Sequence, residues 1–298
     1  MSSGSSLRAA VTIYSLAAIA VVAATGFAAA GHRAPRQHVT HLFVPRVEEP
    51  RIEPADPNVL RVCADPNDLP YSNARGEGYE NAIAQLVATQ LHRAVHYVWQ
   101  PQRRGFVRTT LKAGACDVVM GVPEHFDLAL TTRPYYRSTY VFVTRRDGRA
   151  HVRSLDDRRL RAMRIGVQIV GEDYENPPPV QALAIRGLAD RIHGYTVYGN
   201  YADRAPQRPL IDSVVRGDVD VAIAWGPLAG YFAGRSSVPL VLAPVPDVHD
   251  PLTPFAFGIS MGVRRDDAEL ARQLDSTIVQ REGEIRRILE RFGVPLVS

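Results

Sequence analysis

Four polar residues lie together at the point where an apolar segment ends. The stretch VCADPNDLPYSN carries Asp65, Asn67, Tyr71 and Ser72 in one loop, directly after the apolar residues of VLRVCA. Carboxylate, amide and hydroxyl groups orient a ligand through hydrogen bonds. No catalytic nucleophile accompanies them, so the loop is typical of a receptor, which positions a ligand without transforming it.

Sequence motifs of several enzyme classes are missing from the chain. It contains no H-E-x-x-H, no P-loop and no G-x-G-x-x-G after a strand. Glu172, Asp173, Glu175 and the run DVHD at 247–250 have the chemistry to recruit a cation, although acidic loops between elements are mostly solvated. We therefore expect a protein that is not an enzyme and that binds neither a metal nor a cofactor.

The N-terminus is typical of an export signal. Residues 9–30 are uncharged, apolar and rich in alanine, and they end in Ala28-Ala29-Ala30, a pattern that signal peptidase accepts. The segment is also long enough to span a bilayer, so residues 1–30 are either a cleaved signal peptide or an uncleaved anchor. Residues 31–58 are rich in proline and are expected to form a linker. We expect a periplasmic protein that meets the membrane only through an uncleaved N-terminal segment.

The composition is that of a globular protein with two domains. The chain has 298 residues, of which 46% are hydrophobic and 22% are charged. Its formal net charge is +4, but the arginines are scattered and do not alternate with aromatic residues along a basic stripe. Nucleic acid is therefore not an expected partner.

Apolar periodicity predicts a mixed α/β fold with two lobes. Residues 59–142 alternate strands and helices with short connections, which is typical of a parallel sheet with right-handed crossovers. The same alternation of strands and helices continues in a second lobe at 143–257. Residues 258–298 return to the first lobe as a strand and a long helix broken near Gly283. Two crossings between the lobes form a two-strand hinge, and the groove between the lobes becomes a cleft.

Three loops of the first lobe are expected to face this cleft. They follow three predicted strands, at 65–72, 102–106 and 121–125. In an open parallel sheet, ligands bind at the carboxyl ends of the strands, where such loops meet.

Several stretches of the chain resemble the type II periplasmic solute-binding proteins of family 3. The resemblance lies in PYYRSTYVFV at the first crossing, GDVDVAIAW in the second lobe and GISMGVRRDDAEL on the return. More narrowly, RVCADPNDLPYSN, WQPQRRGFVRTTLKAGACDVVMGVP, TTRPYYRSTYVFV and DVAIAWGPLAGYFA are similar to the MxaJ and XoxJ group, which accompanies quinoprotein methanol dehydrogenases. The resemblance implies a non-enzymatic accessory partner of a periplasmic PQQ-dependent alcohol dehydrogenase and its c-type cytochrome, acting in maturation, activation or docking through the cleft.

The alternative is the substrate-binding component of an ABC transporter for a small organic solute or amino acid. Amino-acid-binding members usually carry Glu-Arg after the third strand, and the arginine grips the ligand carboxylate in a bidentate geometry. This chain has Glu124-His125 at that place, so the clamp is missing and the accessory role is favoured. Arg103 and Arg104 either substitute for the clamp or are solvated arginines at a helix start.

The expected lining of the cleft is mostly aromatic and apolar. It consists of Tyr71, Phe106, Met120, Tyr135, Tyr136, Trp225 and Pro227. Such a lining suits an apolar or aromatic ligand, or a side chain or peptide inserted by a partner. Asp65, Asn67 and Gln168 would supply the orienting polar groups. In the alternative interpretation, the aromatic residues only pack at the hinge, and Asp65 and Asn67 form an Asx-turn.

The two cysteines, Cys63 and Cys116, fall near neighbouring predicted strands. Export to an oxidising compartment favours a disulfide between them. The expected strand register opposes it, because it places Cys63 near Val119 and Cys116 about 10 Å further along the sheet. The sequence therefore leaves the disulfide open.

Overall fold

The computed structural model describes residues 56–148, 151–170, 176–198, 200–246 and 254–297. The chain divides into a unit at Met1–Glu49 and a compact unit at Pro50–Ser298, and all the described residues belong to the second unit. The predicted signal peptide or anchor and nearly all of the predicted linker therefore lie outside the described residues. Within the described residues, no helix is both long enough and apolar enough to cross a membrane.

Three parallel strands begin the sheet of the first lobe. They are β1 (Val59–Ala64), β4 (Ala94–Trp99) and β5 (Val118–Pro123), with β1 in the middle. The helix α1 (Tyr79–Gln90) buries Ile83, Ala84, Val87 and Ala88, whose spacing places them on one face. Between β1 and α1, the short strands β2 (Asn67–Asp68) and β3 (Ser72–Asn73) pair as a small antiparallel ribbon.

The apolar pattern of FVRTTLKAG, residues 106–114, predicts a helix that ends at Gly114, but the observed helix is shorter. Only Phe106–Thr109 is helical, as α2, and Gly114 then takes a positive φ of 75°. The hydroxyl of Thr110 donates to the carbonyl of Phe106 at 2.6 Å. A β-branched residue that binds the backbone in this way is a weak helix former, which accounts for the early end.

The second lobe repeats the alternation of strands and helices. Its strands are β8 (Ile165–Ile169), β9 (Ile192–Thr196), β10 (Val221–Trp225) and β11 (Leu240–Pro244). Its helices are α3 (Pro178–Ile185), α4 (Pro209–Arg216) and α5 (Gly226–Ala233), with the short turns η1 (Arg158–Ala162) and η2 (Ala189–Arg191). α4 ends at Gly217, whose positive φ of 77° is the conformation that glycine favours at a helix end.

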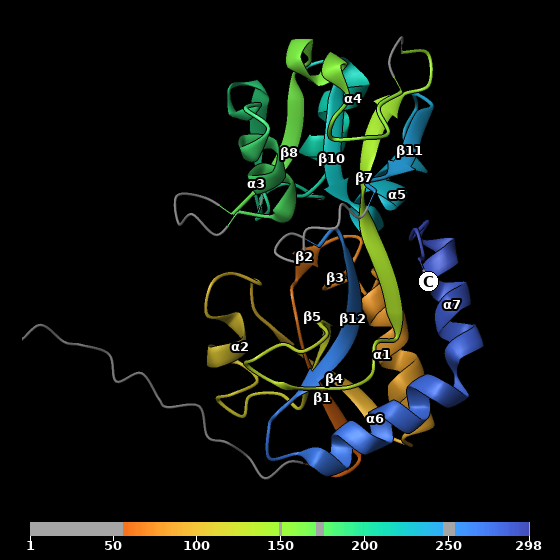
Figure 1. Ribbon diagram of the computed structural model, residues 1–298. Coiled ribbons are helices and arrows are strands. Elements are labelled where there is room, and N and C mark those ends of the chain that lie inside the picture. Colours follow the sequence, from red (N-terminus) through yellow and green to blue (C-terminus); the bar gives the residue numbers. More distant parts are fainter. Residues whose placement is uncertain (1–55, 149–150, 171–175, 199, 247–253, 298) are drawn as a thin grey trace, which may run out of the picture. The chain divides into compact units, whose positions relative to one another are not determined.

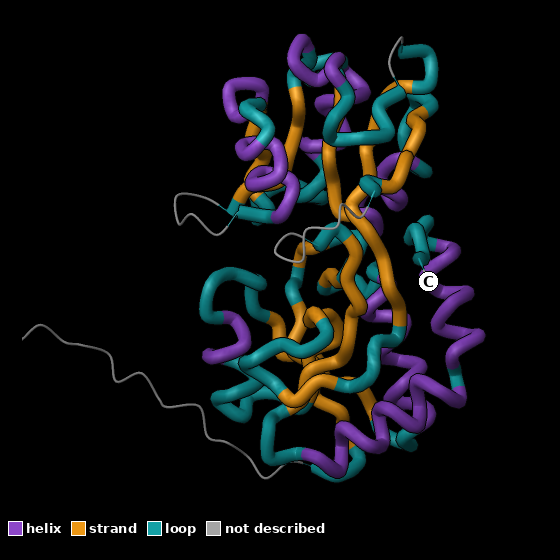
Figure 2. Tube along the Cα trace, viewed as in Figure 1, coloured by secondary structure: helices purple, strands orange, loops and turns teal. Residues whose placement is uncertain are grey.

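Two long strands, β7 (Tyr136–Arg145) and β12 (Ala256–Val263), lie side by side where the lobes meet, and β7 continues from there into the second lobe (Figure 2). The first half of β7 pairs with β12, and its second half pairs with β10 and β11. The second half of β12 pairs with β5 and with the short strand β6 (Leu130–Thr131). Apart from the β2–β3 ribbon, the described strands therefore form one ten-stranded sheet, with the main order β4-β1-β5-β12-β7-β10-β8-β9. The expected lobe boundaries at 142/143 and 257/258 fall inside β7 and β12.

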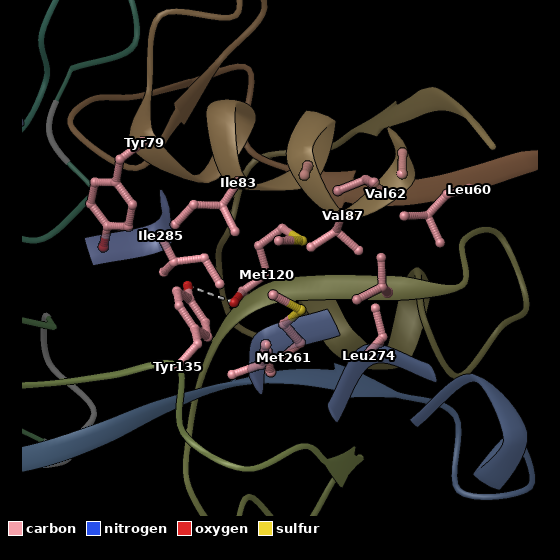
Figure 3. Packing of buried hydrophobic residues seen from close by; sticks show 14 of the residues in the cluster. Leu60, Val62, Tyr79, Ile83, Val87, Met120, Tyr135, Met261, Leu274 and Ile285 are labelled. Carbon is pink, nitrogen blue, oxygen red and sulfur yellow. Dashed lines mark hydrogen bonds between the residues drawn. The ribbon is translucent and has the colours of Figure 1, made fainter. Parts of the chain in front are cut away.

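Separate hydrophobic cores fill the two lobes. In the first lobe, Leu60, Val62, Ile83, Val87 and Met120 pack against one another (Figure 3). The helices α6 (Ala268–Gln280) and α7 (Glu282–Arg291) cover this core beside α1 (Figure 1). Arg281 interrupts the helix between α6 and α7, close to the predicted break near Gly283. In the second lobe, the buried side chains form two clusters, around Val141 and Leu210 and around Phe142 and Ile223.

The C-terminal residues that follow α7 contact both lobes. The hydroxyl of Ser138 donates to the carbonyl of Pro295 at 2.5 Å, and the N–H of Val297 donates to the carbonyl of Arg137 at 3.0 Å. The ring of Phe292 stacks on Tyr231 of α5 with centroids 5.8 Å apart, and Phe292 touches cores on both sides of the hinge. The end of the chain is therefore a third connection between the lobes.

Cys63 and Cys116 form a disulfide, with their Cα atoms 5.6 Å apart. The strand register is as expected, since Cys63 lies opposite Val119. The error in the sequence argument concerns Cys116, which the expected register counts as part of the strand but which precedes β5, whose first residue is Val118. Both cysteines are buried, in a cluster with Phe106, Val119 and other apolar residues.

Candidate functional site

The three loops expected at the cleft are joined through Asp65 and Glu80. Asp65 is buried at the end of β1, and its Oδ2 accepts from the N–H of Gln102 at 2.6 Å, which ties the first loop to the second. A side chain at Gly121 would collide with Oε1 of Glu80, so the carboxyl of Glu80 lies against the end of β5. Glycine at position 121 therefore permits the close approach of the start of α1, which follows the first loop, to the third loop.

Local hydrogen bonds hold the first loop in its shape. Oδ1 of Asp65 accepts from the N–H of Asn67 at 2.8 Å, which is an Asx-turn. The hydroxyl of Ser72 donates to the carbonyl of Asp65 at 2.8 Å. Ser72 is buried, so it shapes the loop and does not face a ligand.

A segment of the second lobe, residues 197–208, binds this loop directly. Nδ2 of Asn67 donates to the carbonyls of Tyr201 and Asp203, at 3.2 and 2.8 Å. The hydroxyl of Tyr201 donates to Oδ2 of Asp65. Polar groups that sequence analysis assigned to a ligand are thus engaged by the protein itself. We call the described residues of this segment, 197–198 and 200–208, the bridging segment.

Gln207 makes further polar contacts between the lobes. Its Nε2 donates to Oδ1 of Asp68 at 3.0 Å, and its Oε1 accepts from Nε2 of Gln168 at 3.1 Å. Gln168, a predicted cleft residue on β8, is therefore linked to the first lobe through Gln207.

Arg103 lies against two tyrosine rings of the bridging segment. Its guanidinium carbon is 5.2 Å from the ring centroid of Tyr201 and 5.8 Å from that of Tyr198. These distances fall within the range of cation–π attraction. Arg103 and Arg104 are both exposed, and Arg103 thus holds the bridging segment from outside the cleft.

Burial and mutual repulsion raise the pKa values of two carboxyl groups in the site. Burial, together with the charge of Asp65, raises the pKa of Asp68 to about 7, against the opposing hydrogen bond from Gln207. Burial and the charges of Asp68 and Asp65 raise the pKa of Glu80 to about 8. Neighbouring carboxylates cannot all ionise cheaply in a low-dielectric site. The cleft therefore holds carboxyl groups that are protonated near neutral pH.

Most of the predicted aromatic and apolar lining belongs to the cores. Tyr135 donates to the carbonyl of Met120 at 2.9 Å (Figure 3), and the hydroxyls of Tyr136 and Tyr79 are 2.8 Å apart. Burial raises the pKa values of Tyr135 and Tyr136 well above that of free tyrosine. Phe106, Met120, Tyr135, Tyr136 and Pro227 are all buried.

Tyr71 and Trp225 are less deeply placed but also pack on neighbouring rings. The ring centroids of Tyr71 and Tyr79 are 5.6 Å apart. Trp225 contacts Tyr140 and Phe257, at 5.3 and 5.8 Å between centroids, where β7 and β12 cross between the lobes. Packing at the hinge accounts for these contacts without a ligand.

The position that carries a carboxylate clamp in amino-acid receptors has a different role here. His125 is exposed and takes a positive φ of 62°. Oε1 of Glu124 instead accepts from Arg137 at 2.7 Å and from the N–H of Gly258 at 3.1 Å. Burial opposes ionisation of Glu124, but these two donors hold its pKa below the ordinary value. Glu124 therefore connects the end of β5 to Arg137 of β7 and Gly258 of β12.

The run GISMG at 258–262 fits the G-x-S-x-G pattern of a hydrolase nucleophile. That motif requires a sharp turn between a strand and a helix. Here the five residues lie inside β12, and Ser260 is fully buried. The match therefore does not form a nucleophile elbow.

A groove of about 510 Å³ opens beside the bridging segment. Leu69, Tyr231 and Phe232 contribute apolar surface to it. Its charged residues are balanced, with three acids and three arginines: Glu77, Asp203, Asp212, Arg204, Arg208 and Arg235. This mixture has no preference for a ligand of one charge.

Within the described residues, no group of three or more His, Cys, Asp or Glu side chains is arranged to hold a metal ion. The acidic residues 172, 173 and 175 and the run at 247–250 lie outside the described residues.

Sequence analysis missed Asp68, Glu80, Tyr201 and Gln207. Asp68 stands in the quoted loop, but a turn aspartate is common for local reasons. Glu80 lies in the first turn of α1, where an acid is expected to complement the helix dipole. Nothing local distinguishes Tyr201 or Gln207 from other residues of a polar loop.

We expect Tyr201→Phe to weaken the closed arrangement of the lobes. The change removes one donor to Asp65 and keeps the ring beside Arg103, so closure should lose about 1.5 kcal/mol. Small-angle scattering should show a larger mean radius of gyration. Tyr198→Phe is the matched control, since it retains the other ring that Arg103 contacts. An equal change in both variants would mean that the hydroxyl of Tyr201 does not hold the lobes.

Two lobes built on one sheet, joined by paired strands and facing each other through polar loops, define the type II periplasmic binding protein fold. The chain belongs to family 3 of the bacterial extracellular solute-binding proteins, whose family model matches residues 60–295. This confirms the family and the fold class that the sequence motifs indicated.

Individual relatives cover most of the chain. Protein MoxJ of Methylorubrum extorquens AM1 is 32% identical over 250 residues, which are 81% of this chain and 83% of the relative. The crystal structure of the periplasmic binding protein XoxJ from Methylobacterium extorquens AM1 is 36% identical, with a TM-score of 0.65, and covers 80% of this chain and 99% of that one. MxaJ from Methlophaga aminisulfidivorans MPT is 26% identical, with a TM-score of 0.67, and covers 80% of this chain and 100% of that one.

Proposed function

We propose that this protein is a non-enzymatic periplasmic accessory partner of a PQQ-dependent methanol dehydrogenase. Its relatives MoxJ, MxaJ and XoxJ support the assignment, and XoxJ is itself described as a periplasmic binding protein. The MxaJ and XoxJ group accompanies methanol dehydrogenases, and the resemblance implies the same accessory role for this chain. The c-type cytochrome of the dehydrogenase is a further candidate partner.

The observation that carries the proposal is the engagement of the cleft loop by the bridging segment. Asp65 and Asn67 bind Tyr201 and Asp203 of the same chain. In a solute receptor, such groups are available to the solute, and closure depends on it. Here the lobes close on each other through the protein's own side chains. Because the protein's own residues occupy these polar groups, the cleft suits docking on a partner better than closure on a solute.

The test compares a partner with a solute panel. The tagged full chain is expected to retain a quinoprotein dehydrogenase from periplasmic extract of methanol-grown cells, identified by mass spectrometry, and added amino acids should not release it. A stable complex should bury about 1,200 Å² or more in total.

The same protein should show little thermal stabilisation by amino acids. A solute receptor at a ligand concentration of 100 Kd gains about 2.7 kcal/mol, which would raise the melting temperature by several degrees. Such a rise, without retention of a dehydrogenase, would overturn the accessory role and identify a transport receptor.

A further inference from the structure

The strand β4 lies at one edge of the ten-stranded sheet. One side of β4 pairs with β1 along its whole length, from Ala94 opposite Val59 to Trp99 opposite Ala64. Within the described residues, no strand pairs with its other side. An open edge of this kind presents backbone N–H and C=O groups to which a further strand can bind.

The register shows which amides of β4 face outward. The N–H of Ala94 donates to the carbonyl of Asn58 at 2.7 Å, and the N–H of Gln100 donates to the carbonyl of Ala64 at 3.0 Å. Bonds to a neighbouring strand involve every second residue, so the amides of residues 95, 97 and 99 point away from β1. Within the part of the chain that the structure describes, these three N–H groups have no acceptor.

The sequence of β4, AVHYVW, does not protect this edge. It contains no acid, lysine, arginine or proline, and its register with β1 is continuous, without a bulge. Charged side chains, prolines and bulges are the features that usually keep an edge strand from pairing with another chain. Valine, tyrosine and tryptophan also favour extended backbone. The strand is therefore suited to accept a partner strand.

Apolar side chains continue to the open edge on one face of β4. Val95, Tyr97 and Trp99 alternate with their neighbours and therefore share a face. The rings of Tyr97 and Trp99 are stacked, with centroids 4.5 Å apart and planes at 19°. Trp99 is 36% exposed, which is unusual for a large apolar side chain in this structure. A strand added at the edge would cover part of this surface.

We propose that β4 is a self-association surface, at which the β4 strands of two copies of this chain pair antiparallel about a two-fold axis at Tyr97. In this register Tyr97 lies opposite Tyr97 of the second copy, and Val95 lies opposite Trp99 of the second copy. Residues that face each other in this way exchange both hydrogen bonds, so the three outward amides of each copy all find acceptors, in about six bonds. The two sheets then form one continuous sheet across the axis.

A second copy fits this edge because the strand is complementary to itself. A two-fold interface brings the same surface patch of both subunits together, so any charge on it would meet a like charge close to the axis. β4 has no acidic or basic residue other than His96, and the pattern of outward groups is symmetric about Tyr97.

The size of the contact predicts a reversible dimer. Two strands of six residues form a smaller contact than the interfaces of about 1,200 Å² or more that hold stable complexes. We therefore expect monomer and dimer to exchange at micromolar to millimolar protein concentrations. The inference concerns the edge of the sheet and does not depend on the accessory function proposed above.

The first test compares two substitutions at Val95. Val95→Pro removes an outward N–H, which an edge strand tolerates, while Val95→Ala loses the side chain and keeps the N–H. Sedimentation equilibrium of the full chain measures self-association. Because the symmetry removes two hydrogen bonds from each dimer, Val95→Pro should bind itself at least about tenfold more weakly than Val95→Ala. Equal self-association of the two variants would overturn the proposal.

The second test uses the wild type and so does not depend on the folding of a variant. Amide hydrogen exchange is followed by NMR at increasing protein concentration. We expect exchange of Val95, Tyr97 and Trp99 to slow as the dimer forms, while His96 and Val98, whose amides face β1, stay unchanged.

Other occupants of the edge give different results in this experiment. Slow exchange of the outward amides at every concentration would mean that another part of the same chain covers the edge. Protection that appears only on adding purified PQQ-dependent methanol dehydrogenase would assign the edge to that protein. Fast exchange under all conditions would mean that the edge stays open. Each of these results would contradict pairing between two copies.

Discussion

Replacing Cys63 and Cys116 together with alanine is expected to lower the free energy of unfolding by about 4 kcal/mol. The disulfide spans a sequence separation of 53 residues, and cross-linking a loop of that length removes much of the entropy of the unfolded chain. It also joins β1 to the segment that enters β5, inside a buried apolar cluster. Chemical denaturation of the oxidised wild type and of the double variant measures the difference.

Reduced wild-type protein is the control for this experiment. It lacks the cross-link but keeps both sulfur atoms, so a similar loss of stability would assign the effect to the bond and not to the cavity left by alanine. A loss below about 1 kcal/mol in both samples would show that the unfolded chain is already compact in this region.

Raising the pH from 6 to 9 is expected to destabilise the protein through Asp68 and Glu80. Their pKa values are raised to about 7 and about 8, so the folded protein holds protons that the unfolded chain has released. Stability from this source is present at low pH and is lost as the pH rises through each folded pKa. The slope is about 1.4 kcal/mol per pH unit for each group, up to about pH 7 for Asp68 and about pH 8 for Glu80.

Neutral variants separate these two groups from the rest of the chain. Asp68→Asn should flatten the decline in melting temperature between pH 6 and 7, and Glu80→Gln should flatten it between pH 6 and 8. Asp266→Asn changes an exposed acid and should leave the profile as in the wild type. If Glu80→Gln has the wild-type slope, the carboxyl of Glu80 is already ionised in the folded protein at pH 6.

The order of the elements could be predicted because it depends on local patterns. Apolar runs mark β1 and β5, and helical spacing marks α1. The break between α6 and α7 also has a local signal, since Gly283 weakens a continuous helix. The hinge is less local, because it depends on residues 258–298 returning to the first lobe.

The contacts of the candidate site could not be predicted, because they join residues far apart in the sequence. Tyr201 and Asp65 are separated by 136 positions, and only the closed arrangement of the lobes brings them together. The role of the aromatic residues could not be predicted either. Tyrosine is common in binding surfaces, but Tyr135 and Tyr136 are buried in the core. Amphipathic side chains serve both roles, and the sequence alone does not say which.

The C-terminal residues after α7 couple the movement of the lobes to the order of the last residues themselves. Pro295 and Val297 bind Ser138 and Arg137 of β7, while Phe292 stacks on Tyr231 of the second lobe. A swing of the lobes about β7 and β12 strains these contacts, so wide opening is coupled to fraying of the last residues. Thermodynamic reciprocity then requires that whatever fixes the end of the chain also favours the closed state. The C-terminal residues therefore oppose opening at the hinge, although they lie far in the sequence from the loops that closure brings together.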